Sequence, residues 1–211
     1  MDKMYVQYGC GLSAPSEWTN FDVSPTLRIQ QFPIAGSLLK KRLNTVFPDN
    51  VLYGDIIRGL PVADNTCDGL YCSHTLEHLS LDDFRRALTN SYRILKPGGI
   101  FRCVVPDLES AARAYIAELD KGNPASSIAF IDTTLLGVKA RPTTVRSRIS
   151  ALFGNSHHLW MWDTKSLAEE LRKAGFVQIR ACRFNDSEDP MFRHVEAADR
   201  FEGAAALECR K

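Results

Sequence analysis

Small residues and an aspartate near the start of the chain have the types and spacing of a ligand-binding loop. A short apolar run, Met4–Tyr8, leads into Gly9-Cys10-Gly11, and Asp22 ends a second apolar patch soon afterwards. Glycine lets the backbone approach a ligand closely because it has no Cβ atom to clash. An acidic residue at the end of the next strand can accept hydrogen bonds from ribose hydroxyls. Together these residues predict a cradle for a nucleoside at the first strand of an α/β fold.

Residues Gly9–Ala14 also satisfy the GxGxxG/A pattern of a dinucleotide-binding loop. That loop opens a helix, and its acidic residue follows about 20 residues later. The distance to Asp22 is too short for a full helix, and Pro15 removes a backbone N–H that a helix interior needs. A pyrophosphate binds at a helix N-terminus, whereas a nucleoside without phosphates, such as S-adenosylmethionine, does not need one. The loop therefore favours S-adenosylmethionine, with a nicotinamide-dependent oxidoreductase as the alternative.

The composition limits the class of protein that must position these residues. The chain has 211 residues, of which 45% are hydrophobic and 24% charged, with a formal net charge of +1. This predicts a single domain over 1–211 and argues against bulk nucleic-acid binding. No apolar run approaches the ~18 residues of a membrane span, and no signal peptide is visible, so we expect a cytoplasmic protein. The six scattered cysteines form no CxxC pair and are predicted to be reduced, structural and free of metal.

The rest of the chain alternates between strand and helix patterns. Strands are expected at 51–55, 68–73, 100–106, 176–179 and 203–209, and helices near 36–46, 80–95, 108–119 and 163–175. This order predicts an α/β, Rossmann-like, doubly wound and mostly parallel sheet. The final two strands lack a helix between them and could pair antiparallel. Residues 125–160 break the rhythm and are interpreted as a lid or substrate-binding insertion.

Four linked segments resemble the class I S-adenosylmethionine-dependent methyltransferases, in particular the small type related to ubiquinone/menaquinone-biosynthesis methyltransferases and to predicted methyltransferases of glycan loci. The segments are Tyr8–Gly11 with Asp22, Gly54–Ile56, Leu60–Leu79 and Leu95–Gly99. Their order and spacing match over about 1–110, and Ala174-Gly175-Phe176 matches the family's late helix–strand turn. The resemblance implies methyl transfer from S-adenosylmethionine to a small-molecule or glycan acceptor.

The resemblance also implies a set of residues for the cofactor. Gly9 and Gly11 would pack against its methionine part, and Asp22 would hold the ribose. Asp55 would accept from the adenine amino group, with Ile56 against the ring. The full set is Gly9, Cys10, Gly11, Asp22, Gly54, Asp55, Ile56, Ser73 and His74, the last two near the transferred methyl.

The chain departs from the family pattern in two ways. Gln7 and Tyr8 stand where an acidic residue is usual, and the helix between the first two strands is reduced or missing. A non-catalytic, methyltransferase-like binding protein is therefore a further alternative.

Histidines are the candidate catalytic residues. His157 and His158 precede an aromatic run that is either a core plug or the wall of a substrate pocket. Because methyl transfer is an in-line displacement, alignment matters most, and a neutral imidazole could take the proton of an acceptor hydroxyl. His157, His158 and His74 are therefore the candidates. The order His74-Thr75-Leu76-Glu77-His78 differs from the His-Glu-x-x-His of zinc helices and lacks a third ligand, so no metal is predicted.

Basic side chains in the predicted insertion allow two interpretations. They form either a solvated surface or a face for an anionic acceptor, such as a phosphate-bearing or nucleotide-linked sugar. They are Lys139, Arg141, Arg146 and Arg148.

Overall fold

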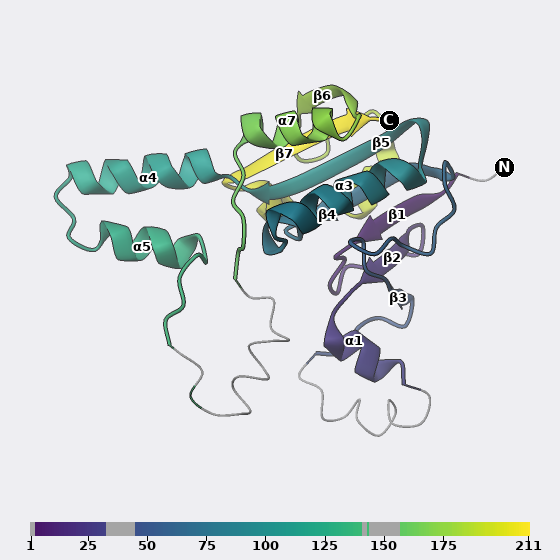
Figure 1. Cartoon of the computed structure of the whole chain (residues 1–211), viewed down its shortest axis with the longest axis horizontal. Helices are drawn as coiled ribbons and strands as arrows, with labels where there is room; N and C mark the ends of the chain where they lie inside the picture. The colour runs from purple at the N-terminus through teal and green to yellow at the C-terminus, as the bar shows by residue number, and fades with distance from the viewer. Residues whose placement is uncertain (1–2, 33–44, 141–142, 144–156) are drawn as a thin grey trace.

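The computed structural model describes residues 3–32, 45–140, 143 and 157–211, and its centre is a seven-stranded sheet (Figure 1). The strand order is β3-β2-β1-β4-β5-β7-β6. The strands are β1 (Tyr5–Tyr8), β2 (Thr19–Asp22), β3 (Val51–Tyr53), β4 (Cys67–Ser73), β5 (Leu95–Pro106), β6 (Val177–Ala181) and β7 (Ala204–Arg210). Strands β1 to β5 pair in parallel, whereas β7 is antiparallel to both β5 and β6. The predicted fold class and the antiparallel pairing of the last two strands are confirmed.

The helices begin where the sequence places capping residues. The described helices are α1 (Pro25–Gln30), α3 (Leu81–Ile94), α4 (Leu108–Asp120), α5 (Ser126–Thr133) and α7 (Thr164–Lys173), with 3₁₀ turns η1 (Leu76–His78), η2 (Pro190–His194) and η3 (Ala198–Phe201). The Ser80 hydroxyl accepts from the Asp83 N–H, and the Asp163 carboxylate accepts from two N–H groups of α7. Ser80 and Asp163 are therefore the N-caps of α3 and α7, close to the expected starts of these helices. The helix expected near 36–46 lies outside the described residues except at 45–46, which are irregular.

The two faces of the sheet are covered differently. On one face, Phe84 of α3 and Leu167 of α7 belong to a large apolar core, in which the rings of Phe84 and Trp162 are 4.2 Å apart. On the other face, Trp18 and Phe192 pack in a smaller core that η2 closes. Successive strand residues point to opposite faces, so both cores draw on the same strands. The sequence indicates helices on both faces, whereas the described cover of the second face is mainly 3₁₀ turns and loops.

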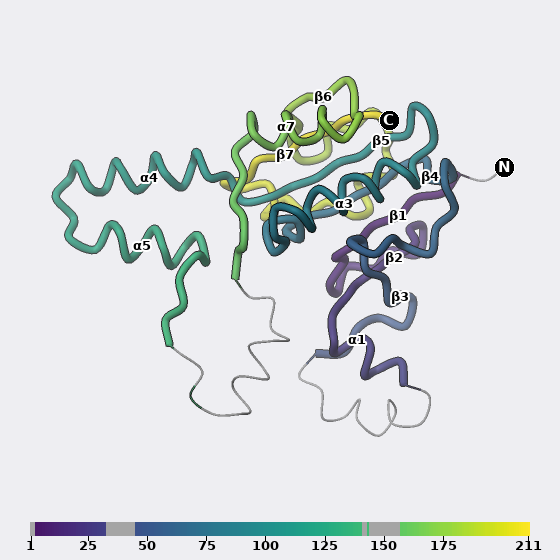
Figure 2. The backbone as a smooth tube through the Cα atoms, viewed as in Figure 1, coloured from purple at the N-terminus to yellow at the C-terminus, as the bar shows by residue number. Residues whose placement is uncertain are grey.

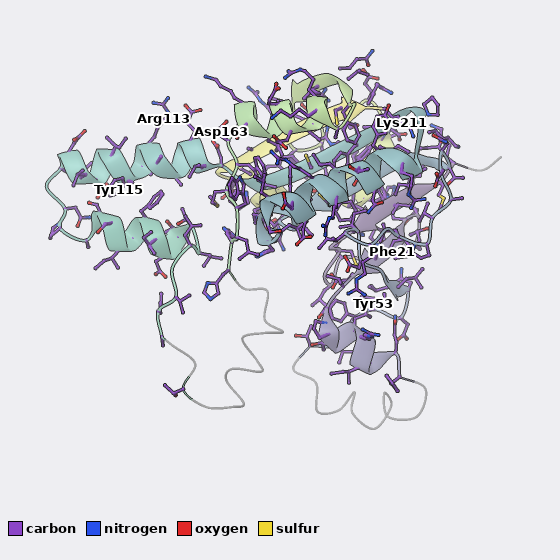
Figure 3. All side chains as sticks on the ribbon, viewed as in Figure 1. Phe21, Tyr53, Arg113, Tyr115, Asp163 and Lys211 are labelled. Carbon is purple, nitrogen blue, oxygen red and sulfur yellow. The ribbon has the colours of Figure 1, made fainter. Side chains whose placement is uncertain are left out.

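Helices α4 and α5 form a hairpin that projects beyond the sheet (Figure 1). Tyr115 points from α4 toward α5 (Figure 3), and its ring lies 5.4 Å from that of Phe130. No residue of α4 is buried, which departs from the core-facing helix that its apolar spacing predicts. Among the described residues, no helix is long and apolar enough to cross a membrane. All six cysteines are free, and five are buried, as predicted for structural thiols.

The strand order places the predicted ligand-binding residues at one edge. From the neighbouring strands β1 and β4, the chain continues outward to β2 and β3 on one side and to β5 on the other. In such sheets, ligands bind beyond the carboxyl ends of the strands where the order reverses. The chain passes from β1 to β2 without a helix (Figure 2), as the sequence indicates.

Candidate functional site

A cavity of about 470 Å³ lies beyond the carboxyl ends of β1 to β4. Volumes of this order hold small molecules of drug size. Six of the nine residues predicted for the cofactor line it: Gly9, Asp22, Gly54, Asp55, Ile56 and His74. Cys10, Gly11 and Ser73 are in the adjoining backbone but do not line it. Thr75 and His78 also line the cavity, and the sequence did not assign them to the cofactor.

Gly9 is where the backbone most clearly requires glycine. Its φ of +63° is in the left-handed region, and a Cβ atom there would lie 2.0 Å from the Thr75 Oγ1 atom. The strand end of β1 and the loop after β4 therefore come together only because residue 9 has no side chain. A larger residue would displace the Thr75 side chain and narrow the cavity.

The Asp22 carboxylate holds the loops around the cavity. Its Oδ2 accepts from the Gly11 N–H at 2.9 Å, and its Oδ1 accepts from the Ser24 N–H at 2.7 Å. Each oxygen of a carboxylate has two lone pairs, so each keeps one acceptor site. Asp55 is similar: its Oδ1 accepts from the Ile57 N–H at 2.9 Å. Both carboxylates are thus fixed in place while retaining acceptor capacity.

Gln7 accounts for one departure from the family pattern. The buried Gln7 side chain donates from Nε2 to the Ser13 carbonyl at 2.8 Å and to Asn20 Oδ1 at 2.6 Å. These bonds fold the helix-free β1–β2 connection back onto the sheet. Tyr8 keeps its hydroxyl inside the protein, 3.2 Å from Ser91 Oγ. Neither side chain replaces the usual acid, but Gln7 orders a loop that has no helix to do so.

A second polar group adjoins the cavity, centred on Glu77 in η1. The Glu77 side chain is 1% exposed, and its Oε1 lies 3.5 Å from His74 Nδ1 and 3.9 Å from each Nε2 of two other histidines, His78 and His158. These are ion-pair distances, and neither carboxylate oxygen accepts a hydrogen bond from any described residue. We call Glu77, His74, His78 and His158 the Glu77 cluster.

Backbone contacts bring the residues of this cluster together. The Glu77 carbonyl accepts from the N–H groups of Leu159 at 2.8 Å and Trp160 at 3.1 Å, which holds the 158–160 segment against η1. His74 has a φ of +50°, and its Nε2 donates to the Arg200 carbonyl at 2.9 Å. The cluster is therefore assembled from two parts of the chain, residues 74–78 and His158, while the Arg200 carbonyl holds His74 from a third.

Of the three catalytic candidates, the structure brings two together. The side chains of His74 and His158 both face the Glu77 carboxylate. His157 is exposed, and it contributes its backbone carbonyl, which accepts from His78 Nδ1 at 3.0 Å. The central Glu77 was absent from the predicted set. The histidines at 74 and 78 on either side of it are a local signal, but nothing local links them to His158.

The two candidate imidazoles have opposite pKa shifts. Burial lowers the pKa of His74, but the Glu77 carboxylate and the Arg200 carbonyl more than compensate, so its pKa is raised. Burial dominates at His158, and its pKa is lowered despite the same carboxylate. Near neutral pH, His158 is thus the neutral imidazole of the pair, and His74 is the one that more readily holds a proton.

The fold and the cavity define a Rossmann-like domain with a nucleoside-sized site at its switch point. Residues 6–103 match the family described as "Methyltransferase domain". The chain is also 43% identical over 56 residues to the "Probable methyltransferase ltbC" of Aspergillus luteorubrus, a match over 25% of this chain and 20% of that protein. The chain thus matches one fifth of the length of this curated relative. These matches support the class I S-adenosylmethionine-dependent methyltransferase that the sequence predicts.

Solved structures support the same fold. A Thermotoga maritima S-adenosylmethionine-dependent methyltransferase, described as a possible histamine N-methyltransferase, superposes with a TM-score of 0.52 at 18% identity, covering 100% of this chain and 83% of that one. A second S-adenosylmethionine-dependent methyltransferase, from Archaeoglobus fulgidus, gives a TM-score of 0.50 at 16% identity, and the match covers 99% of this chain and 86% of that one. At these identities the likeness concerns the fold alone.

Proposed function

We propose that this chain binds S-adenosylmethionine in the cavity at the ends of β1 to β4 and transfers its methyl group to an acceptor. The observation that carries the proposal is that six residues predicted from sequence line one cavity of about 470 Å³. Bound there, the cofactor would supply an electrophilic methyl group on a sulfonium. The residues fit such a group, because a Cβ at Gly9 would obstruct the loop beside the cavity and Asp22 keeps free acceptor sites.

The family resemblance suggests the residue roles, and the positions of these residues around the cavity are compatible with them. Asp22, which ends β2, would accept from the ribose hydroxyls, and Asp55, after β3, would accept from the adenine amino group. Ile56 would provide an apolar contact for the ring. His74 lines the cavity beyond β4, at the end where the methyl group and the acceptor would meet. The lowered pKa of His158 favours its neutral form, which is the form of an imidazole that can accept a proton.

The acceptor class is the finer part of the proposal. We propose a small molecule or glycan that carries a hydroxyl group, because a neutral imidazole near the site is suited to accept a hydroxyl proton. Residues 125–160 would form the lid over this acceptor. The contact between the 158–160 segment and Glu77 supports that role, because it holds the end of the segment at the site. Lys139 is paired with Asp132, and Arg141, Arg146 and Arg148 lie outside the described residues, so an anionic acceptor rests on the sequence alone.

Isothermal titration calorimetry with S-adenosylhomocysteine and S-adenosylmethionine tests cofactor binding. We expect one site per chain for both ligands and no heat with NAD or NADP, because no helix follows Gly9–Ala14 to bind a pyrophosphate. Folded protein that binds neither adenosyl ligand would overturn the proposal. Binding of both without turnover on hydroxyl-bearing acceptor pools would favour the non-catalytic alternative.

The Asp22→Ala variant tests the site assignment. We expect its affinity for S-adenosylhomocysteine to fall by ~1–3 kcal/mol, about 5- to 150-fold, since the ribose hydroxyls lose their acceptor. The matched control is Asp120→Ala, an exposed aspartate at the end of α4, which should bind as the wild type does. Asp22 also accepts hydrogen bonds from two backbone N–H groups, so its replacement could disorder the loop as well as remove the contact with the ribose. Thermal unfolding of both variants distinguishes these two effects, because a disordered loop would lower the melting temperature. Unchanged affinity in Asp22→Ala would show that the ribose is bound elsewhere.

A further inference from the structure

Three side chains beside the cavity have the composition of a metal site. Glu77, His78 and His158 each offer one ligand atom, and the three atoms lie within 4.8 Å of one another. We propose that they bind a divalent first-row transition metal ion of the Zn²⁺ class. One carboxylate and two imidazoles leave coordination positions open, as in catalytic zinc sites and two-histidine, one-carboxylate iron sites. Metal binding does not depend on methyl transfer, although an ion bound to His158 would occupy the lone pair with which the proposed function has that imidazole accept a proton.

The Glu77 carboxylate is the strongest single reason. It is 1% exposed, and neither oxygen accepts a hydrogen bond from a described residue. A buried charge without partners is strongly unfavourable, so proteins pair such groups or use them to coordinate metals. A cation among these three side chains would give the carboxylate the partner that it lacks. By contrast, the Asp22 carboxylate already accepts two backbone hydrogen bonds.

One of the two histidines, His78, is oriented as metal ligands usually are. His78 donates its Nδ1–H to the His157 carbonyl at 3.0 Å, which fixes the tautomer and leaves the Nε2 lone pair facing Glu77. A backbone carbonyl in this position is a common outer partner of metal-binding histidines. Burial lowers the pKa of His158, and a neutral ring is the form that binds a metal.

The spacing requires only a small adjustment. Each Nε2 of His78 and His158 lies 3.9 Å from Glu77 Oε1. Ligands bound at about 2.0–2.1 Å in a tetrahedron lie roughly 3.3 Å apart, so each imidazole would move toward the carboxylate by about half an ångström. The three ligand atoms all lie within 4.8 Å of one another, so the two imidazoles would also have to approach each other. The two rings are nearly perpendicular, with centroids 5.1 Å apart, so their rims can converge. The backbone bonds from Leu159 and Trp160 to Glu77 keep both segments in place meanwhile.

The nearby His74 offers the competing explanation. Its Nδ1 is 3.5 Å from the same carboxylate oxygen, and a protonated His74 would balance the Glu77 charge without a metal. An ion would compete with that proton. Because His78 lines the cavity, an ion beside it would also lie at the cavity edge and could take an oxygen ligand such as a hydroxyl or carboxylate. Only this last point rests on the proposed function.

Titration with Co²⁺ and Zn²⁺ tests the site. The full chain, freed of metal with a chelator and brought to pH 7.5, is titrated with Co²⁺ while its visible absorption is recorded, and Zn²⁺ is measured by competition with a chelating dye. We expect one ion per chain and little affinity for Mg²⁺, which imidazole ligands do not favour. Glu77→Gln and His158→Asn should each weaken Zn²⁺ binding at least 10-fold. His194→Asn is the matched control, because this exposed histidine also lies beside a carboxylate, 3.8 Å from Glu17.

The outcomes separate the alternatives. Absence of Co²⁺ absorption, or equal Zn²⁺ affinity in wild type, Glu77→Gln and His158→Asn, would overturn the proposal and leave a protonated His74 as the partner of Glu77. Circular dichroism verifies folding, and if Glu77→Gln does not fold, His158→Asn alone decides. Binding of S-adenosylhomocysteine by the metal-free chain is measured in parallel. A negative metal result with intact nucleoside binding would reject the metal site without touching the proposed function.

Discussion

The second face of the sheet holds a set of buried ionic side chains in which the signs of the charges are reversed relative to the Glu77 cluster. There the Arg102 guanidinium, 0% exposed, lies among the carboxylates of Asp186, Glu196 and Glu208, a set we call the Arg102 cluster. In one group a buried cation is surrounded by acids, and in the other a buried acid is surrounded by imidazoles. The two differ in the distances between their charges and in whether the charges depend on pH.

The Arg102 cluster has short contacts around a central guanidinium whose charge does not change with pH. Arg102 donates from Nη1 to Glu208 at 2.7 Å and to Asp186 at 3.0 Å, and its Nη2 is 2.6 Å from Glu196. Arginine stays protonated at every pH that the protein experiences. These contacts join β5, β7 and the loop before η3. The geometry indicates a group that holds the structure together.

The Glu77 cluster has looser contacts and titratable partners. Its charges are 3.5–3.9 Å apart, and its partners are histidines, whose charge changes near neutral pH. A group built only for stability gains nothing from such partners. A buried charge with loose, titratable neighbours beside a cavity is therefore the better candidate for function. Removal of the central charge from each cluster tests this difference.

Arg102→Met should have the largest effect. Removal of the guanidinium leaves three carboxylates near one another in a buried place, so we expect the free energy of unfolding to fall by ~3–5 kcal/mol. Urea denaturation followed by circular dichroism measures it. The control is Arg113→Met on α4, an exposed arginine paired with Glu109, which should lose less than ~0.5 kcal/mol. Similar small losses in both variants would mean that the Arg102 cluster does not hold the fold.

Glu77→Gln should have a smaller effect of the opposite sign. In metal-free buffer at pH 8, the substitution removes a buried charge that accepts no hydrogen bond from a described residue. We expect the free energy of unfolding to stay the same or rise by ~1–2 kcal/mol. The same urea titration measures it, beside Arg102→Met. A loss as large as that of Arg102→Met would contradict the comparison and make Glu77 a structural residue.

The sequence could predict the edge of the fold where the cavity lies. Gly9, Asp22 and Asp55 lie at the carboxyl ends of successive strands, and parallel strands place these ends together. The local sequence pattern was therefore enough to predict that the three residues lie at one site. The helix starts at Ser80 and Asp163 can also be predicted from local sequence, because an N-cap bonds to residues only two or three positions away. The family resemblance added the roles that geometry alone does not assign.

The Glu77 cluster could not be predicted in the same way. The sequence around His74–His78 offers no third metal ligand, whereas the fold supplies His158 from a distant segment. His158 lies near Glu77 because the backbone N–H groups of Leu159 and Trp160 donate to the Glu77 carbonyl, and no side-chain pattern encodes these backbone bonds. The cover of the second face was missed for a related reason, since 3₁₀ turns such as η2 have no helical periodicity to detect.

The finest test of the comparison is the pH dependence of stability, because two histidines facing one carboxylate should respond with opposite sign. The folded-state pKa of His74 is raised above 6.5, so its stabilisation is fully present below pH 6.5 and is lost as the pH rises through the folded pKa. The pKa of His158 is lowered, so its contribution is present above pH 6.5 and is lost as the pH falls through the folded pKa. Urea denaturation of metal-free protein from pH 5 to 8.5, in wild type and two variants, measures both.

In His74→Asn, the stability difference from wild type should shrink as the pH rises above 6.5, whereas in His158→Asn it should change below 6.5, where only the wild type must bury a proton at residue 158. Asparagine suits residue 74 because it tolerates the left-handed backbone found there. Glu77, His78 and Arg200, the other charges that face these rings, are retained in both variants. A charged His74 also lowers the pKa of His158, so the His74→Asn difference includes this coupling as well as the loss of the His74 imidazole. Parallel pH profiles for the two variants would mean that the shared carboxylate does not distinguish them, and the division of the Glu77 cluster into a proton-holding and a neutral histidine would be wrong.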